Sequence, residues 1–181
     1  MRQTTIARNY AEALLALSQK ANDPHGWGKM LTDVAQAMGS EVMLRRFLES
    51  PKVSHLQKSD LLARALQDRV PRILVRYLQT LVKNRRQMLI PVIATEYFKL
   101  LDDVENRVHA DVTLAKEPTA ADKKMITERL ASALKMEVVP HVRIDPSILG
   151  GVIVKIGDTV MDGSVRRRLT TLRSRLVASK A

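Results

Sequence analysis

The part of this chain whose residue types most suggest chemistry is residues 148–169, ILGGVIVKIGDTVMDGSVRRRL. Paired glycines, a serine and consecutive arginines are also found in phosphate-binding loops. Such a loop ends in Gly-Lys-Ser/Thr at a helix N-terminus, where backbone amides face the anion. Here Gly150 and Gly151 precede VIVKI, whose alternation predicts a strand with Lys155 pointing off a sheet face. No G-x-G-x-x-G opens a βαβ unit either. The segment therefore predicts no nucleotide site.

A β-hairpin followed by a helix accounts for the same residues. Gly150 and Gly151 permit a turn or a close backbone approach. Two turns are expected, at Gly157-Asp158 and at Asp162-Gly163. Ser164 is the expected cap of the last helix. That helix is expected to carry a buried apolar seam of Val165, Leu169, Leu172 and Leu176, with Arg166 and Arg173 on its polar side.

No set of side chains predicts catalysis. The chain has no cysteine, which excludes disulfides and thiol nucleophiles. The four histidines (His25, His55, His109, His141) are far apart and none forms an i, i+4 pair, so no metal site is expected. Asp102 and Asp103 are adjacent and do not face each other on a helix. We therefore expect a non-enzyme with no cofactor and no small-molecule substrate.

The charge balance points to acidic partners. Lys and Arg exceed Asp and Glu enough to give a formal net charge of +11. A nucleic-acid-binding protein is the alternative that this charge favours. Against it, aromatic residues make up only 3% of the chain, so stacking platforms for bases are scarce, and no RRM, KH or zinc-finger signature occurs. The chain shows no membrane-spanning run and no signal peptide, which favours the cytoplasm.

The first hundred residues predict helices joined by short connections, and hence a six-helix bundle. The first helix is expected after Thr4 or Thr5, and the second after Asp23, with Trp27 on its buried face. A short piece carrying Met43, Phe47 and Leu48 follows. The remaining helices are expected at about 54–67, from Pro71 to a left-handed Asn84, and at 87–106.

Near residue 106 the apolar period changes from helical to alternating. Residues 107–115 and 137–145 predict strands, with Pro140 marking the second as an edge strand or a bulge. Thr119 is the expected cap of the helix between them, whose buried face includes Ala133. The sequence predicts an α+β protein with an all-helical domain at 1–106 and a small mixed α/β domain at 107–181.

GGVIVKIGDTVMDGSVRRRLTTL closely resembles the C-terminal signature of the delta subunit of F-type ATP synthases, the family of the mitochondrial oligomycin-sensitivity-conferring protein. The signature positions are Gly150, Gly151, Gly157, Asp158, Asp162, Gly163 and Ser164. IARNYAEALLALS resembles the family's first helix, and LVKNRRQMLIPVIATEY the join of its fifth and sixth. Pro140 departs from the pattern, because the family usually has a strand former there.

The resemblance implies a stator part that resists rotor torque, peripheral on the cytoplasmic face of a bacterial membrane or on an organellar inner membrane. In this family the N-terminal domain holds N-terminal segments of the alpha subunits, in a groove between its first and fifth helices. The expected groove residues are Ala7, Tyr10, Ala11, Ala13, Leu14, Val75, Leu78 and Val82. The wide apolar stripe of the fifth helix also suits a central helix with neighbours on both sides.

The family's C-terminal domain holds the end of the peripheral stalk, which the b subunits form in bacteria. The expected contacts are Ile153, Lys155, Arg166 and Arg173. Two modes of contact remain open at this point: arginines docking on acidic stalk residues, or the stalk packing on the hairpin's apolar face.

Overall fold

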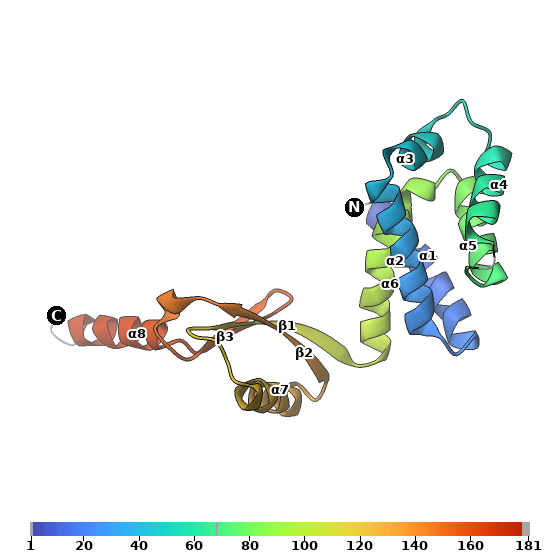
Figure 1. Cartoon of the computed structure of the whole chain (residues 1–181). Helices are drawn as coiled ribbons and strands as arrows, with labels where there is room; N and C mark the ends of the chain where they lie inside the picture. Colours follow the sequence, from blue (N-terminus) through green and yellow to red (C-terminus); the bar gives the residue numbers. More distant parts are fainter. Residues whose placement is uncertain (1, 68, 179–181) are drawn as a thin grey trace. The chain divides into compact units, whose positions relative to one another are not determined.

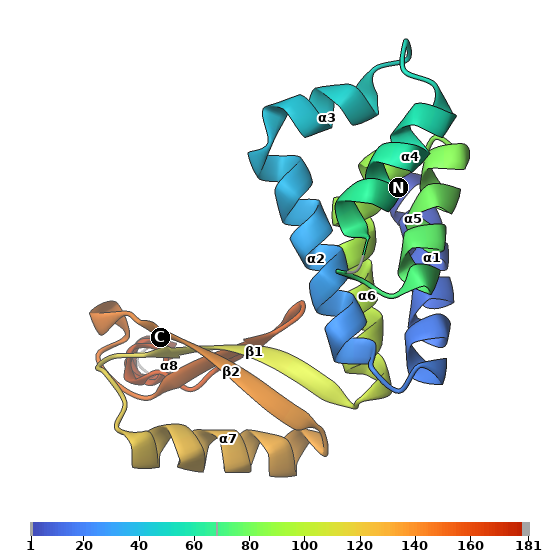
Figure 2. The same cartoon turned by 45° about the vertical axis from the view of Figure 1, so that its right-hand side comes forward.

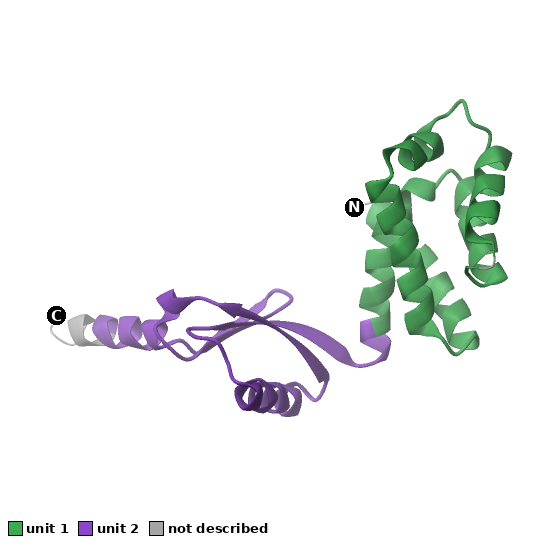
Figure 3. Ribbon diagram, in the orientation of Figure 1, with its two compact units in different colours: residues 1–101 green, residues 102–181 purple. Residues whose placement is uncertain are grey.

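The computed structural model describes residues 2–67 and 69–178. They form the expected α+β fold, with eight α-helices and one four-stranded mixed sheet (Figure 1). The chain divides into two compact units, residues 1–101 (unit 1) and residues 102–181 (unit 2), which Figure 3 colours separately. Among the described residues, no helix combines the length and the apolar character needed to cross a bilayer.

Unit 1 is helical (Figure 2). Its helices share one apolar core. Its elements are α1 (Arg2–Lys20), α2 (Pro24–Ser40), α3 (Val42–Glu49), α4 (His55–Leu66), α5 (Arg72–Lys83), the short 3-10 helix η1 (Gln87–Leu89) and α6 (Ile90–Val104), whose last residues belong to unit 2. Every α-helix of this group supplies buried side chains to the core. Burial of these apolar stripes, rather than helix propensity, supplies most of the stability of such short helices.

Local hydrogen bonds set several of the helix starts. The Asp23 side chain accepts from the N–H of Gly26, and Pro24 follows as the first helical residue, as predicted. Ser54 and Gln57 form a reciprocal capping box at the start of α4. The predicted caps Thr4 and Thr5 are wrong, because α1 already begins at Arg2 and both threonines lie within it.

One other expectation for unit 1 is corrected. Asn84 ends α5 with an ordinary negative φ of −85°, and the left-handed residue is its neighbour Arg85, with φ of 56°. In the short helix α3, the core buries Leu48, Phe47 packs against it, and Met43 is almost fully exposed.

A buried lysine holds the end of α3. Lys58 is 6% exposed, and its Nζ donates to the carbonyl oxygens of Leu48 at 2.6 Å and Ser50 at 2.8 Å. Gln87 Nε2 also donates to the carbonyl of Leu48, at 2.8 Å. The last carbonyls of a helix have no partner within it and carry partial negative charge. Lys58 therefore caps α3 from α4 and fixes the turn between the two helices.

Unit 2 is a mixed sheet covered on one face by α7 (Figure 1). The sheet order is β2-β1-β3-β4, with β1 parallel to β2 and antiparallel to β3. Its elements are β1 (Arg107–Leu114), α7 (Ala120–Leu134), β2 (Glu137–Ile144), the 3-10 helix η2 (Pro146–Ile148), β3 (Val152–Ile156), β4 (Thr159–Asp162) and α8 (Val165–Ala178). Ala110, Val112, Val138 and Val154 form the buried core beneath α7.

Pro140 lies in β2, which is an edge strand as the sequence predicts. The N–H of Glu137 donates to Asn106 of the neighbouring segment, and that of Asp145 donates to Leu114. Amide directions alternate along a strand, so odd-numbered residues of β2 point their N–H groups at β1. The nitrogen of Pro140 therefore faces away from β1, and the proline costs no hydrogen bond of the ladder.

The predicted cap of α7 is present. The Thr119 side chain accepts from the N–H of Asp122, and Asp122 accepts in return from Thr119. Of the predicted buried face, Ala133 is exposed, and Ala131 packs against the core in its place. Ala131 directly follows Leu130, and both residues pack with Ile126 and Leu134 against the core of the sheet.

Candidate functional site

One surface in unit 1 and two in unit 2 are candidates for binding partner chains. In unit 1, α1 and α5 are joined by a pair of tyrosines. The Tyr77 hydroxyl donates to the backbone carbonyl of Tyr10 at 3.0 Å, and the two rings meet edge to face with centroids 6.5 Å apart. Burial, followed by the nearby Tyr10 phenol, raises the pKa of Tyr77. Tyr77 therefore stays protonated and donates this hydrogen bond throughout the physiological pH range.

Tyr10 is fixed from its other side as well. Its hydroxyl accepts from Asn84 Nδ2 at 3.0 Å, and the Arg86 guanidinium lies 5.6 Å from its ring centre. Cation–π contacts of this kind favour a defined ring position. The end of α5 is thus attached to the first half of α1, and Tyr10 lies at the surface between them, half-buried.

Most of the groove residues expected from the family lie in the core. Ala7, Ala11, Leu14, Leu78 and Val82 are all buried and belong to the apolar core of unit 1. Their burial gives these five residues a packing role within unit 1, and their contact with a partner segment stays a prediction. A core stripe and a groove stripe have the same helical spacing, so the sequence alone did not separate them. Tyr10 and Val75 are half-buried, and Ala13 is exposed.

The accessible surface between α1 and α5 follows from the tyrosine contacts. At helical spacing, Ala13 shares the flank of α1 that carries Tyr10. Ile73, which is 50% exposed, shares the flank of α5 that carries Tyr77. Val75 lies on the opposite flank of α5 and is not part of this surface. Tyr10, Ala13 and Ile73 are therefore the accessible residues on these flanks of α1 and α5.

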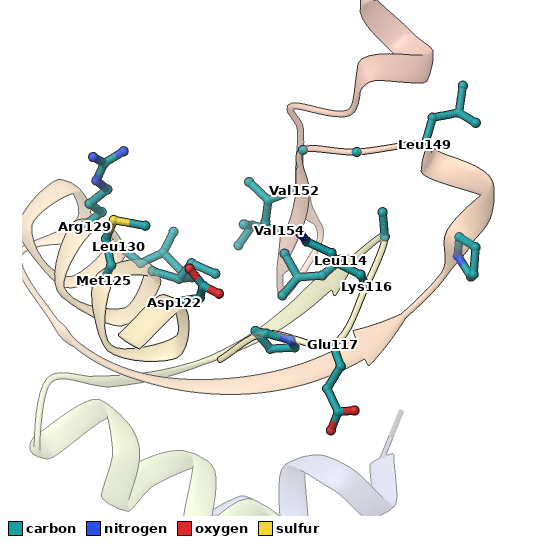
Figure 4. Close-up of a pocket in the computed structure, with 16 residues that line it drawn as sticks. Leu114, Lys116, Glu117, Asp122, Met125, Arg129, Leu130, Leu149, Val152 and Val154 are labelled. Atoms are coloured by element: carbon teal, nitrogen blue, oxygen red, sulfur yellow. The ribbon is translucent and has the colours of Figure 1, made fainter. Parts of the chain in front are cut away.

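In unit 2 a groove lies between α7 and the sheet. It has a volume of about 870 Å³ and is largely lined by apolar side chains. In Figure 4 the Asp122 and Leu130 side chains of α7 lie on the side of the helix toward Leu114, Val152 and Val154, whereas Arg129 points away from these residues. Met125 on α7 and Leu149 after η2 stand at its rim and are 45% and 66% exposed. Sequence patterning missed this groove, although exposed methionine on an otherwise buried helix face is typical of binding surfaces.

The groove is not purely apolar. Lys116 and Glu117 lie on the loop at one end, and Asp122 and Arg129 on α7. Hydrogen bonds from Thr119 hold the pKa of Asp122 below its usual value, and the Lys116 charge acts in the same direction. Charges of both signs around an apolar floor suit an amphipathic peptide, because its polar side chains find partners at the rim.

The signature glycines build the frame of unit 2. Gly151 has φ of +80° and lies against the backbone of Gly163. The N–H of Gly163 donates to Val152, and that of Val165 to Gly150. These contacts place the start of α8 beside the start of β3. The predicted hairpin turn at Gly157-Asp158 is also present, with φ of 54° at Gly157.

Two residues of the signature act as caps. The Ser164 side chain accepts from the N–H of Arg167 at the start of α8, as predicted. Asp162 accepts from the N–H of Ser164 at 2.9 Å. These two signature residues therefore fix the backbone where α8 begins.

The four expected stalk residues are partly brought together. Ile153 and Arg166 line one depression of about 410 Å³ between the hairpin and α8. Lys155 is exposed on the sheet face opposite α7, and Arg173 is exposed two turns farther along α8.

The apolar seam of α8 is uncovered. Val165, Leu169 and Leu172 are 39%, 53% and 55% exposed, which corrects the expectation of a buried seam. The side chain of Leu176 lies outside the described residues. Amphipathic spacing in a sequence indicates that one face of a helix is apolar, but it does not identify what covers that face. The described part of α8 thus presents both apolar and arginine side chains to solvent.

Comparisons with known proteins agree with this architecture. Residues 6–176 match the family model described as ATP synthase delta (OSCP) subunit. ATP synthase subunit delta of Gemmatimonas aurantiaca is 56% identical over 177 residues, covering 98% of this chain and 96% of that protein. The Desulforamulus reducens protein of the same name is 34% identical over 178 residues, with 98% of each chain covered.

A solved structure is similar as well. A chain in the cryo-EM structure of the Toxoplasma gondii mitochondrial ATP synthase hexamer superposes with a TM-score of 0.60 at 25% identity, covering 94% of this chain and 97% of that one. The likeness extends through both units, so the α+β architecture is that of a known chain.

Proposed function

The chain belongs to the ATP synthase delta (OSCP) family, and we propose that its two units divide a stator's work, unit 1 holding the catalytic head and unit 2 the peripheral stalk. The protein is a non-catalytic stator subunit of an F-type ATP synthase and partners with other subunits of that complex. It is peripheral to the membrane-bound enzyme. The observation that carries this function is 56% identity to a delta subunit over 98% of the chain.

For unit 1 we propose a six-helix bundle that binds N-terminal segments of the alpha subunits. The shared core of its helices supports the bundle. The binding surface is the flank between α1 and α5, with Tyr10, Ala13 and Ile73 as contacts. A helical segment can lie along such a flank and bury its apolar face there. The tyrosine contacts support this assignment, because they hold both walls of the surface in place.

For unit 2 we propose that the C-terminal segments of the b subunits dock on it. The groove beneath α7 offers an apolar floor for a helix, with Met125 and Leu149 as rim contacts. The exposed seam and arginines of α8, with Ile153, form the alternative docking surface. The large net positive charge of the chain, +11, supports an acidic partner at either surface.

Two separate binding units suit the mechanical role of a stator. A subunit under torque must hold each partner through a folded surface, so that the force is transmitted through packed helices and strands and not through flexible chain. Each unit has its own apolar core. In a bacterial cell the protein lies on the cytoplasmic face of the cell membrane, where the head of the enzyme is.

One experiment tests the assignment directly. The full chain, carrying an affinity tag, is added to detergent-solubilised membranes and recovered with its bound proteins. We expect alpha, beta and b subunits in the recovered material. Recovery of none of them with a folded protein would contradict the stator function. The nucleic-acid alternative finds no support in the family comparisons, and it would require a tight gel shift with mixed DNA and RNA at physiological salt.

A further inference from the structure

Two histidines that are 32 positions apart in sequence lie together in unit 2. His109 on β1 and His141 on β2 project from the sheet face opposite α7, because their neighbours Ala110 and Val138 are buried beneath that helix. The parallel register places Asp111 directly across from His141, which makes His109 its diagonal neighbour. Nδ1 of His109 is 2.9 Å from Nε2 of His141, with the rings nearly parallel at 20°.

A carboxylate lies behind the first histidine. Asp102 Oδ2 is 3.1 Å from Nε2 of His109. An ionised carboxylate only accepts hydrogen bonds, so Nε2 of His109 carries the proton of this bond. In the neutral ring the lone pair is then on Nδ1, the atom that faces His141. Asp102 thus selects the tautomer whose free nitrogen faces the second histidine.

We propose that His109 and His141 form a binding site for a divalent transition-metal ion, of the class that includes Zn²⁺, Ni²⁺ and Cu²⁺. Metal–nitrogen bonds of about 2.0–2.1 Å place two neighbouring ligand nitrogens roughly 2.9–3.4 Å apart. The 2.9 Å between the two ring nitrogens is within that range. Without the ion, Nε2 of His141 carries the proton that lies between the two rings. When the ion binds, Nε2 loses this proton and Nδ1 of His141 takes one up. Both rings therefore remain neutral.

The surroundings favour this class of ion. Imidazole nitrogens prefer these metals, whereas Ca²⁺ and Mg²⁺ prefer oxygen ligands. The hydrogen bond from His109 to Asp102 reproduces the carboxylate–histidine–metal arrangement, which orients the ring and raises its basicity. Half of the His109 side chain is exposed, so the rings have room to turn both lone pairs toward one ion. No group of three or more potential ligands converges within the described residues, so water completes the coordination.

Metal binding here ties the edge strand to the sheet. Within the described part of the chain β2 pairs with β1 alone, and the two histidines come one from each strand. A bridging ion adds a side-chain link to this parallel ladder. Because the link exists only in the folded unit, the ion stabilises it by mass action.

The test is a Zn²⁺ titration of the full chain by isothermal calorimetry after removal of metals with EDTA. The wild-type protein is expected to bind Zn²⁺ saturably at one site. His109→Ala and His141→Ala should each weaken binding at least tenfold, and His55→Ala, at an exposed histidine of unit 1, should leave it unchanged. Asp102→Asn should weaken binding by about tenfold or more without abolishing it, since it removes only the orienting carboxylate.

Thermal unfolding provides a second readout. Zn²⁺ should raise the Tm of the wild type and of His55→Ala, and it should have no effect on His109→Ala or His141→Ala. Circular dichroism of each variant without metal verifies that it is folded. The absence of saturable Zn²⁺ binding to the wild type, or undiminished binding to folded His109→Ala and His141→Ala, would overturn the proposal.

Discussion

Gly151 lies so close to the carbonyl oxygen of Gly163 that a β-carbon on Gly151 has no room. Its φ of +80° is also in the region that side chains rarely adopt. The two effects act together at the point where β3 begins and α8 is attached. Neither neighbour can yield easily, because the obstructing atoms belong to the backbone.

Gly151→Ala should therefore destabilise unit 2 strongly. We expect a loss of roughly 2–5 kcal/mol in the free energy of unfolding, from the left-handed conformation and the clash combined. Gly157→Ala is the matched control, since Gly157 has φ of +54° and open space around it. It should cost about 1–2 kcal/mol. Urea denaturation followed by circular dichroism measures both, and equal losses would show that the contact with Gly163 is unimportant.

Lys58→Met should destabilise unit 1. The substitution keeps the apolar stem of the side chain and leaves the carbonyl of Ser50 without its Lys58 donor, while Leu48 retains the bond from Gln87. An unsatisfied, partly buried carbonyl costs about 1–3 kcal/mol. Lys52→Met, at an exposed position in the same turn, is the control and should have little effect. Equal stability of the two variants by urea denaturation would contradict the capping role of Lys58.

Acid should weaken unit 2 through its aspartate caps. Hydrogen bonds from Thr119, Ser147 and Ser164 lower the pKa of Asp122, Asp145 and Asp162, respectively, below the ordinary value of 3.8. A carboxyl whose pKa is lower in the folded state stabilises that state above its unfolded pKa. This stabilisation is therefore complete above about pH 3.8 and is lost as the pH falls through the lowered values.

The corresponding measurement is the urea concentration at the unfolding midpoint from about pH 2 to about pH 5, a range that spans the ordinary pKa of 3.8 and the lowered values beneath it. The triple variant Asp122→Asn/Asp145→Asn/Asp162→Asn should show a smaller fall at low pH than the wild type. Asparagine keeps an acceptor oxygen at each cap and removes the titratable negative charge. Parallel pH curves would mean that other carboxyl groups cause the acid sensitivity.

The caps illustrate what the sequence reveals well. Asp23, Thr119 and Ser164 were predicted correctly because each bonds to an N–H within three residues, so the signal is local. The edge position of Pro140 was predictable for a similar reason, since proline cannot donate to a ladder. These features depend on the residue and its nearest neighbours in the chain.

Features that depend on distant packing were missed. Ala7 and Ala11 have the spacing of a groove and lie in the core, because only the approach of other helices decides which stripe is covered. The exposure of Leu169 and Leu172 likewise depends on what lies beside α8. His109 and His141 appeared unrelated until the parallel register of β1 and β2 brought them together.

Ala13→Trp should block the surface between α1 and α5. A large ring at this exposed position occupies the space beside Tyr10 that we assign to a segment of an alpha chain. Binding of an alpha N-terminal peptide to the full chain should weaken at least tenfold, about 1.4 kcal/mol. Gln19→Trp, on a different flank of α1, is the control and should bind normally in calorimetry. Normal binding by folded Ala13→Trp would place the alpha segment elsewhere.

Unit 2 has two candidate docking surfaces, the groove beneath α7 and the exposed side of α8. Measuring the binding of a peptide from the C-terminal end of the b subunits distinguishes them. If the groove beneath α7 is the site, Met125→Asp should weaken binding at least tenfold, because a charge is placed against an apolar partner. Ser132→Asp, which adds the same charge on an exposed part of α7 outside the groove, should have little effect. Unchanged binding by folded Met125→Asp would remove the groove from consideration.

If α8 is the site instead, Arg166→Glu/Arg173→Glu should weaken binding, and salt should weaken it in the wild type. Exposed charges are screened over about 8–10 Å at 0.1–0.15 M salt. Affinity measured at low and high salt decides the question. A salt-insensitive affinity that survives the double substitution would exclude electrostatic docking on α8.

The orientation of Pro140 affects how readily the chain can pair with other chains before it joins the enzyme. A sheet border normally presents a row of unpaired amide and carbonyl groups, which can recruit a strand from another molecule. Pro140 removes one donor from the middle of the outer side of β2, and the opposite border is β4, only four residues long. Neither border is a good template for intermolecular β-pairing. A newly synthesised copy is thereby protected against edge-to-edge aggregation until it is incorporated into the enzyme.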